Sequence, residues 1–239
     1  MRNLLVACSV FCALTFSATA SNFNYASGFA AVNDMSSKAL INAMERVDDR
    51  IYAVGEHGII IYSDDLGDNW TQSEVVPFTN TLTDIDCISK VECWATGHDA
   101  TILHSNDSGK TWTKQYEDID FDAPLLSIHM YDNGEGIAIG AFALSLRTTD
   151  GGQSWGYLFM DDDDFQPHFN YAYGDTQAWR KSSANEAYAV GEIGKYYISD
   201  DKGLNWLVVS TGYDGSYWSG IKVDDGKSLL LGMLSLIHI

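Results

Sequence analysis

Basic residues are scarce in this sequence. Its 239 residues contain 14 lysines and arginines against 33 aspartates and glutamates, which gives a formal net charge of −19 at pH 7. A chain of this charge repels the phosphate backbone that dominates nucleic-acid affinity, and it repels an anionic membrane surface for the same reason. We therefore expect neither a nucleic-acid-binding protein nor one that adsorbs to anionic lipid.

The local signatures of several enzyme classes are also missing. The sequence contains no H-E-x-x-H helix motif and no P-loop, which are motifs of zinc peptidases and nucleotide-binding proteins. The G-x-S-x-G string of serine hydrolases occurs at residues 152–156, but there it overlaps an octet that repeats along the chain. Hydrolase and nucleotide chemistry therefore have no motif support. We expect no catalytic residues, no cofactor and no resident metal.

No apolar run reaches the ~20 residues that a helix needs to cross a membrane. The run from Leu4 to Phe16 follows a single arginine and precedes Ala18-Thr19-Ala20, the small-x-small pattern of a signal-peptidase site. We interpret residues 1–20 as a signal peptide and residues 21–36 as an N-terminal extension. The protein is then exported, either periplasmic or secreted.

Cysteine is rare once that peptide is removed, since only Cys87 and Cys93 remain. They flank a polar turn between two apolar runs, so a hairpin would place them opposite one another. Disulfides persist in the compartment to which a signal peptide leads, and a loop this short contributes ~2 kcal/mol in the chain-entropy model. We expect a disulfide; two free buried thiols are the alternative.

One acidic octet ending in tryptophan occurs four times. The copies read S-D-D-L-G-D-N-W, S-N-D-S-G-K-T-W, T-T-D-G-G-Q-S-W and S-D-D-K-G-L-N-W, and their tryptophans stand 42, 43 and 51 residues apart. That spacing is typical of propeller blades with one insertion. The shared positions are Ser63, Asp65, Gly67 and Trp70; Ser105, Asp107, Gly109 and Trp112; Thr148, Asp150, Gly152 and Trp155; and Ser199, Asp201, Gly203 and Trp206.

Each octet follows the same prelude, of the form Y-A-V-G-E-H-G-I-I-I-Y-S, in which two β-rich runs are joined by a tight turn after a glycine. Further apolar runs lie upstream, at residues 39–47, 82–89, 125–131 and 171–181, and downstream, as at 70–76 and 206–210. Four strands per repeat, with almost no helical periodicity, indicate radially arranged antiparallel blades, because one repeat cannot bury both faces of its sheet.

The predicted fold is therefore an all-β propeller over residues 37–239. Four blades are complete, and residues 217–232 begin a fifth repeat that has no octet. Four and a half blades cannot close a ring. We expect a fragment of a longer gene product; closure by a second chain is the alternative.

The octet itself is expected to be scaffold. Its aspartate and hydroxyl side chains can hydrogen-bond to the backbone of the turn between the third and fourth strands. Its glycine supplies a positive φ, and its tryptophan is expected to start the fourth strand and fill the gap against the next sheet. A calcium loop is the alternative, although the octet lacks the spaced oxygen ligands of such loops.

The octet is the Asp-box, or BNR repeat, found in sialidases and several other propellers. Joined to the Y-A-V-G-x-x-G prelude over roughly residues 37–232, it resembles the photosystem II stability/assembly factor family and its bacterial relatives. The resemblance implies an exported, seven-bladed, non-enzymatic propeller that assists assembly of a membrane protein complex, and that is lumenal if the organism is photosynthetic. It also implies an arginine-rich client patch, whereas this chain offers only Arg46, Arg50, Arg147 and Arg180, dispersed among acidic residues.

Two other functions remain open. Sialidases need an arginine cluster and an F-R-I-P-like segment, and the chain has neither, so a sialidase-like or carbohydrate-binding propeller is the first alternative. The second is a periplasmic accessory protein of an envelope transporter. In the leading interpretation the partner is a membrane protein complex or one of its exposed segments.

Strand alternation indicates which turns can bind that partner. In a four-stranded blade, the turns between the second and third strands lie opposite the Asp-boxes, together with the loops between blades. Four consecutive aspartates after the third octet form either a solvated loop or an acidic lip for a basic segment or a hard cation. A metal site at Glu56, His57, His98 and Asp99 is a minor alternative to partner contact. The candidate partner-binding residues are Glu56, His57, His98, Asp99, Asp161, Asp162, Asp163, Asp164, His168 and Glu192.

Overall fold

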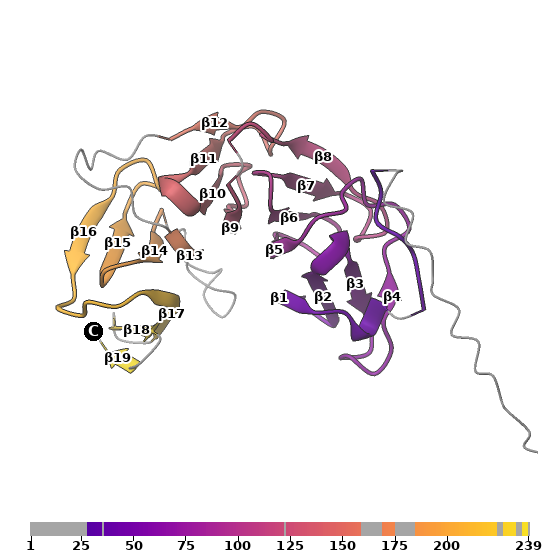
Figure 1. The fold of residues 1–239 in the computed structure, drawn as a ribbon, viewed down its shortest axis with the longest axis horizontal. Helices are drawn as coiled ribbons and strands as arrows, with labels where there is room; N and C mark the ends of the chain where they lie inside the picture. Colours follow the sequence, from indigo (N-terminus) through magenta and orange to yellow (C-terminus); the bar gives the residue numbers. More distant parts are fainter. Residues whose placement is uncertain are drawn as a thin grey trace, which may run out of the picture.

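The computed structural model describes residues 28–34, 36–121, 123–158, 169–174, 185–223, 227–232 and 236–238. The expected signal peptide, Asp161 to Asp164 and His168 lie outside these ranges. The described chain forms four four-stranded antiparallel sheets and one three-stranded sheet, which stand side by side along an open arc (Figure 1). The prediction of an all-β propeller with four complete blades and part of a fifth is confirmed.

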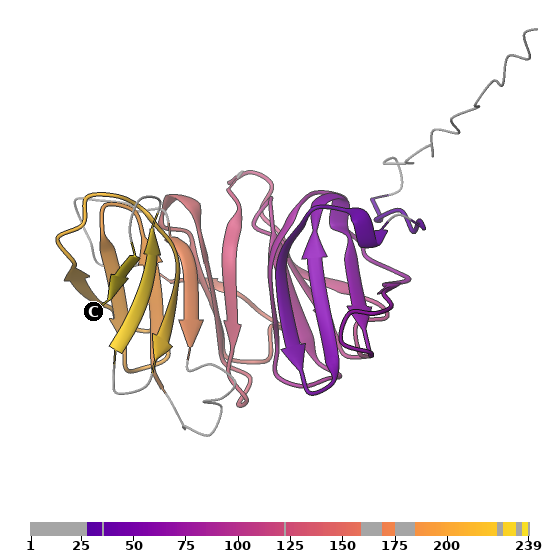
Figure 2. The same ribbon diagram turned by 90° about the horizontal axis from the view of Figure 1, so that it is seen from below.

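The blades follow one another along the chain, and their strands run between the two faces of the arc, which are at the top and bottom of Figure 2. The first strand of each blade lies on the inside of the arc (Figure 1). The strands of blades one and two are β1 (Ile41–Val47), β2 (Arg50–Gly55), β3 (Ile60–Ser63), β4 (Thr71–Gln72), β5 (Leu82–Cys87), β6 (Cys93–Gly97), β7 (Ile102–Ser105) and β8 (Thr113–Tyr116). Those of blades three to five are β9 (Leu125–Met130), β10 (Gly136–Gly140), β11 (Ser145–Thr148), β12 (Gly156–Tyr157), β13 (Phe169–Gly174), β14 (Ala187–Gly191), β15 (Lys195–Ser199), β16 (Leu207–Ser210), β17 (Tyr217–Val223), β18 (Lys227–Gly232) and β19 (Leu236–His238).

The hydrophobic core lies between the blades. Tyr52 and Val54 of blade one pack in one cluster with Leu82 and Ile85 of blade two, and a second cluster joins blades two and three. Every residue of β6, β10 and β14 is buried, because the second strand of a blade has a neighbouring blade on each face. This explains why these strands are apolar runs rather than alternating ones.

The glycine that ends each second strand is required for space. The backbone at Gly55 and Gly140 is extended, with φ of −167° and −165°, which any residue can adopt. A Cβ at Gly55, Gly97 or Gly140 would overlap the carbonyl oxygen of Leu40, Thr81 or Pro124, respectively. The start of each inner strand therefore lies directly against this glycine.

The four octets form turns with the same hydrogen bonds. In the first, the Ser63 hydroxyl donates to the Asp65 carboxylate (2.8 Å) and accepts from the Gly67 N–H (2.8 Å), while Asp65 accepts from the Asn69 N–H (2.8 Å). The same three bonds recur in the other three turns. Hydrogen bonds from Asn69 hold the pKa of Asp65 below its ordinary value. The carboxylate is thus used within its own turn.

The tryptophan of each octet lies one residue before the fourth strand, so the prediction that it starts this strand is wrong by one position. Trp112 is only 2% exposed, packs in the cluster between blades one and two, and donates its Nε1–H to the Ser73 hydroxyl (3.2 Å). Trp206 packs beside Ile139 of the preceding blade. The prediction that the octet tryptophan fills the gap against the next sheet is therefore wrong for Trp112 and Trp206, which pack against the preceding sheet.

A cysteine pair in blade two and the N-terminal extension beside blade one complete the fold. Cys87 lies opposite Cys93 in the register of β5 and β6, and their Sγ atoms are 2.11 Å apart, at bonding distance. Residues 28–34, the described part of the N-terminal extension, lie against blade one: the Ala30 N–H donates to the Val76 carbonyl (2.9 Å).

Replacing Asp107 with alanine is expected to lower the free energy of unfolding by ~1–2 kcal/mol, because the Thr111 N–H (2.9 Å) and hydroxyl (2.6 Å) lose their acceptor. Urea denaturation followed by tryptophan fluorescence measures the change. Asp68→Ala removes an exposed carboxylate from the first octet and is the control, with an expected change within ~0.5 kcal/mol. Equal losses in the two variants would contradict the structural role of Asp107.

Candidate turn-face binding surface

Four hairpin turns and the loops between blades lie on one of the two faces of the arc (Figure 2), which we call the turn face. The turns are η3 (Glu56–Gly58), residues 98–101, η4 (Ala141–Ala143) and residues 192–194. Backbone hydrogen bonds tie them to the loops, from Gly58 N–H to the Asn80 carbonyl (2.7 Å) and from Gly194 N–H to the Gly215 carbonyl (2.8 Å). The Asp-boxes lie on the opposite face of the arc, which we call the Asp-box end.

The apex residues of these turns have left-handed backbones. The φ angles of His57, Asp99, Phe142 and Ile193 are 57°, 57°, 55° and 52°, and the next residue in each turn also has a positive φ. Such turns match the twist of a hairpin but favour glycine or asparagine, because a left-handed residue with a side chain costs ~1–2 kcal/mol. Phe142 is nevertheless 55% exposed and Ile193 50% exposed. The turn face therefore displays two large apolar side chains, Phe142 and Ile193, to solvent.

The structure distributes the predicted partner-binding residues along this face. Glu56 accepts a hydrogen bond from the Leu40 N–H (3.0 Å), and His57 Nε2 lies 3.9 Å from Glu56 Oε2. His98 is exposed, and Glu192 is half-buried. Within the described ranges, no group of three or more His, Cys, Asp or Glu side chains is placed to hold a metal ion, so Glu56, His57, His98 and Asp99 are not brought together as ligands.

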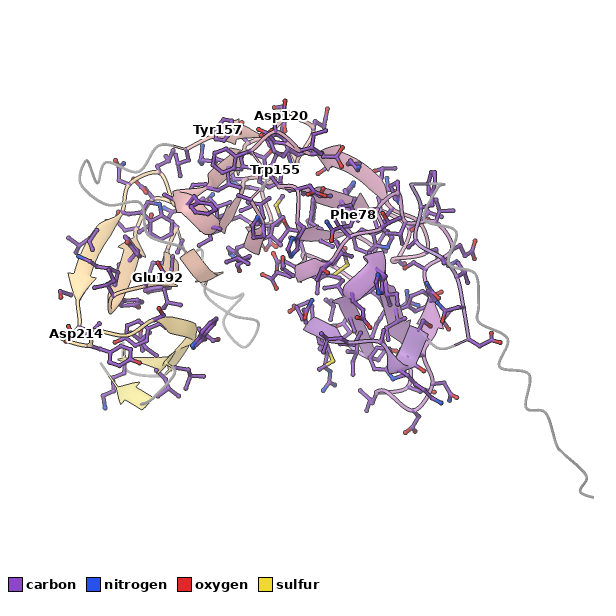
Figure 3. All side chains as sticks on the ribbon, in the orientation of Figure 1. Phe78, Asp120, Trp155, Tyr157, Glu192 and Asp214 are labelled. Carbon is purple, nitrogen blue, oxygen red and sulfur yellow. A yellow bond between two sulfur atoms is a disulfide. The ribbon has the colours of Figure 1, made fainter. Side chains whose placement is uncertain are left out.

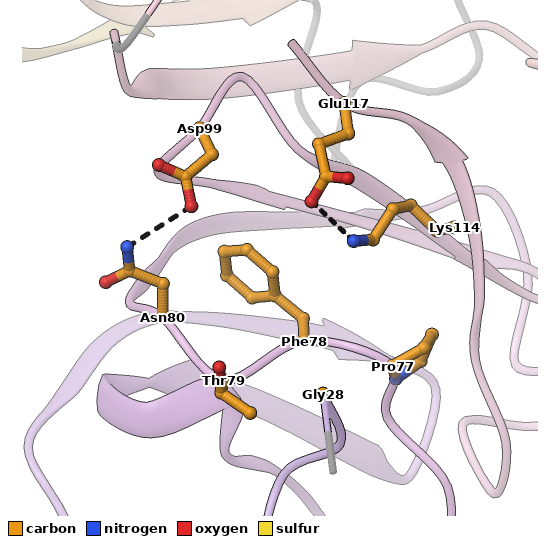
Figure 4. A pocket seen from close by; sticks show the side chains of 8 residues that line it. All are labelled: Gly28, Pro77, Phe78, Thr79, Asn80, Asp99, Lys114 and Glu117. Atoms are coloured by element: carbon orange, nitrogen blue, oxygen red, sulfur yellow. Dashed lines mark hydrogen bonds and ion pairs between the residues drawn. The ribbon is translucent and has the colours of Figure 1, made fainter. Parts of the chain in front are cut away.

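A cavity of about 310 Å³ opens on the turn face between blades one and two. Its walls come from the loop at residues 77–80, from Asp99, from Lys114 and Glu117, and from Gly28. In Figure 4 the Phe78 ring lies between Asp99 and the Lys114–Glu117 pair. Lys114 Nζ is 2.5 Å from Glu117 Oε1 and 5.9 Å from the centre of the Phe78 ring, and Asn80 Nδ2 donates to Asp99 Oδ2 (3.3 Å).

Sequence reasoning identified Asp99 but missed Phe78, Asn80, Lys114 and Glu117. The motif P-F-T-N at residues 77–80 places an aromatic residue in a loop between blades on the turn face, and this motif could have identified Phe78 from the sequence. The juxtaposition of Phe78 with residues 36 and 39 positions further along the chain depends on how blades one and two pack.

The distribution of charged side chains differs between the turn face and the Asp-box end. Among the described residues, the ion-paired lysines and arginines other than Lys114 lie at the Asp-box end. These pairs are Arg50 with Asp64 (2.6 Å), Lys90 with Asp49 (2.7 Å), and Arg147 (2.9 Å) and Lys202 with Glu135. At the turn face the carboxylates of Asp120, Glu192 and Asp214 are spread along the arc (Figure 3). The turn face is thus acidic.

A separate pair of carboxylates joins blades two and three. Asp84 of β5 accepts hydrogen bonds from the Ser127 hydroxyl (2.7 Å) and the Ile128 N–H (3.0 Å) of β9. Asp86 accepts one from the Met130 N–H (2.6 Å). Asp84 is half-buried at the junction, and desolvation raises its pKa to about 7. Because all these contacts are internal, we assign this pair to the junction between blades rather than to a binding surface.

Among the described residues, no helix combines the length and the apolar character needed to span a membrane.

Several solved structures share the fold at low sequence identity. The chain is 14% identical to an ancestral GH74 enzyme. The match covers 80% of this chain and 27% of the enzyme, with a TM-score of 0.64. It is 14% identical to the WD40 β-propeller domain of Doa1, with 85% and 64% coverage and a TM-score of 0.59. A structure described as YCF48 bound to D1 peptide is 15% identical, with 84% and 92% coverage and a TM-score of 0.45. No curated protein matches the chain.

A family model described as photosynthesis system II assembly factor YCF48 matches residues 73–229. The match covers more than half of the chain and includes the last three Asp-boxes, the loop that forms the Phe78 cavity and the start of blade five. This chain belongs to the photosynthesis system II assembly factor YCF48 family.

Proposed function

We propose that this protein is an exported, non-enzymatic scaffold that binds an exposed segment of a membrane protein and assists the assembly or stability of its complex. The observation that carries the proposal is the family match over residues 73–229, since the family is described as an assembly factor. The apolar run and the small-x-small pattern in residues 1–20 support export.

The turn face is the proposed binding surface. The carboxylates of the Asp-boxes are occupied by bonds within their own turns, as with Asp65 and Asn69. The apexes of the turn face carry exposed side chains beside the loops between blades, among them Phe142 and Ile193. His57, Phe142 and Ile193 are the three such side chains that we expect to contact the partner.

A gene deletion tests this function. Loss of the gene is expected to reduce the accumulation of one membrane complex in the host, measured by native gel electrophoresis of solubilised membranes. The wild-type gene should restore the complex, and the triple variant His57→Gly, Phe142→Gly, Ile193→Gly should not.

Glycine is the matched choice here because it adopts φ near 55° without a Cβ penalty, so the triple variant should unfold at the same or a higher temperature than wild type. Asp68→Ala, at the Asp-box end, is the control that should restore the complex fully. Unchanged complex levels after deletion, or full rescue by the triple variant, would overturn the proposal.

A further inference from the structure

We infer that the cavity between blades one and two binds the side chain of an arginine or lysine from the partner segment. The inference rests on the proposed function, because it specifies the chemistry of the segment that the turn face takes. Neither the family description nor the fold assigns a ligand to this cavity. Its own walls indicate one.

The floor of the cavity is an aromatic ring. Phe78 is 4% exposed and packs in the core between blades one and two, so its ring is fixed in position. The face of an aromatic ring attracts a cation placed within about 6 Å of its centre. Lys114 Nζ lies 5.9 Å from that centre, which shows that an ammonium group is accommodated over this ring.

Carboxylates lie on two sides of the ring. Glu117 is paired with Lys114. Asp99 has no lysine or arginine partner among the described residues; its Oδ2 accepts only the neutral Asn80 amide (3.3 Å). A carboxylate of this kind can still accept a charge-assisted hydrogen bond, which is roughly twice as strong as a neutral one. A second cation entering beside Lys114 would therefore meet Asp99 and the Phe78 ring.

The size and surroundings of the cavity fit one long side chain. About 310 Å³ is at the lower limit of small-ligand pockets, and is sufficient for a single guanidinium or ammonium group with its methylene stem. The surrounding acidic turn face raises the local concentration of a basic segment and speeds its encounter with the chain.

The test uses two capped amino acids that differ in charge at the side-chain end. N-acetyl-arginine amide is expected to bind the chain with a Kd on the order of 1 mM, measured by chemical-shift changes in NMR spectra of the labelled protein. N-acetyl-citrulline amide, which is neutral and nearly isosteric, is expected to bind at least about tenfold more weakly, equivalent to ~1.4 kcal/mol.

Variants of the chain locate the site. Asp99→Asn should weaken arginine binding about tenfold, while Asp214→Asn removes one charge from the same face outside the cavity and should change it less than about twofold. Lys114→Gln frees Glu117 and should strengthen binding about fivefold. That gain separates a binding cavity from a merely structural one, since loss of a structural ion pair would not increase affinity.

Equal binding of arginine and citrulline, or equal weakening by Asp99→Asn and Asp214→Asn, would overturn the inference. The gene deletion distinguishes this failure from failure of the proposed function. If the Asp99→Asn gene restores the membrane complex to the wild-type level, the inference that this cavity binds a basic side chain of the partner is wrong, while the scaffold function stands. If deletion leaves the complex unchanged, the scaffold function itself is wrong.

Discussion

Wild-type protein is expected to lose up to ~4 kcal/mol of stability between about pH 4 and pH 7 through Asp84, and Asp84→Asn should remove this loss. Burial raises the pKa of Asp84 from 3.8 to about 7 in the folded state. The folded state therefore holds a proton that the unfolded state releases, so this stabilisation is complete below pH 3.8 and is lost as the pH rises through about 7. Three pKa units at ~1.4 kcal/mol each give the magnitude.

Urea denaturation at intervals between pH 4.5 and pH 8 measures this dependence. The difference between wild type and Asp84→Asn isolates Asp84 from the carboxylates whose pKa is lowered, such as Asp64, because their contributions occur in both proteins. Ser127→Ala is a second variant: its hydroxyl donates to Asp84 (2.7 Å) and favours the charged form, so its loss should move the transition to higher pH. Parallel curves for wild type and Asp84→Asn would contradict the prediction.

Replacing Gly140 with alanine is expected to cost about 3 kcal/mol. The backbone there is extended, so alanine has no conformational penalty, and the effect comes from overlap of its Cβ with the Pro124 carbonyl oxygen. Neither group can move away freely, because the Ala141 N–H donates to the same carbonyl (3.1 Å) and Gly140 pairs with Leu125.

Gly156→Ala is the matched control for this prediction. Gly156 also lies in a strand, β12, but nothing lies within 4 Å of its Cβ position. Its replacement should leave the free energy of unfolding within ~0.5 kcal/mol of wild type. Thermal and urea denaturation of both variants compare them directly. A Gly140→Ala protein as stable as Gly156→Ala would show that the inner strand tolerates displacement at this point.

The fold could be predicted from sequence because its signals are local and repeated. Each octet carries a turn aspartate, a glycine with positive φ and a tryptophan within eight residues, and the recurring spacing of the tryptophans identifies the blade. For the glycine that precedes the turn in each prelude, such as Gly97, the sequence predicted only a turn. Its actual constraint at Gly97 is the Thr81 carbonyl, a neighbour defined by strand pairing rather than by adjacent residues.

The site could be predicted only in part. Strand alternation predicted that the turns of Glu56, His98 and Glu192 lie on the face opposite the Asp-boxes, and the structure places them there. The cavity combines Phe78, Asp99 and Glu117 from three segments, so it exists only once blades one and two have packed. Asp84 was missed for a related reason, since T-D-I-D-C has the alternation of a half-exposed strand and its burial comes from blade three.

The left-handed apexes also bear on how new specificity can arise in this scaffold. At His57, Phe142 and Ile193 the backbone angle is already set by the hairpin, and glycine, asparagine or aspartate satisfies it without disturbing a core contact. Substitutions there change what a partner meets while leaving blade packing intact. A combinatorial library at these three apex positions could therefore be selected for new ligands in an unchanged framework, much as loop residues are varied in engineered binding proteins.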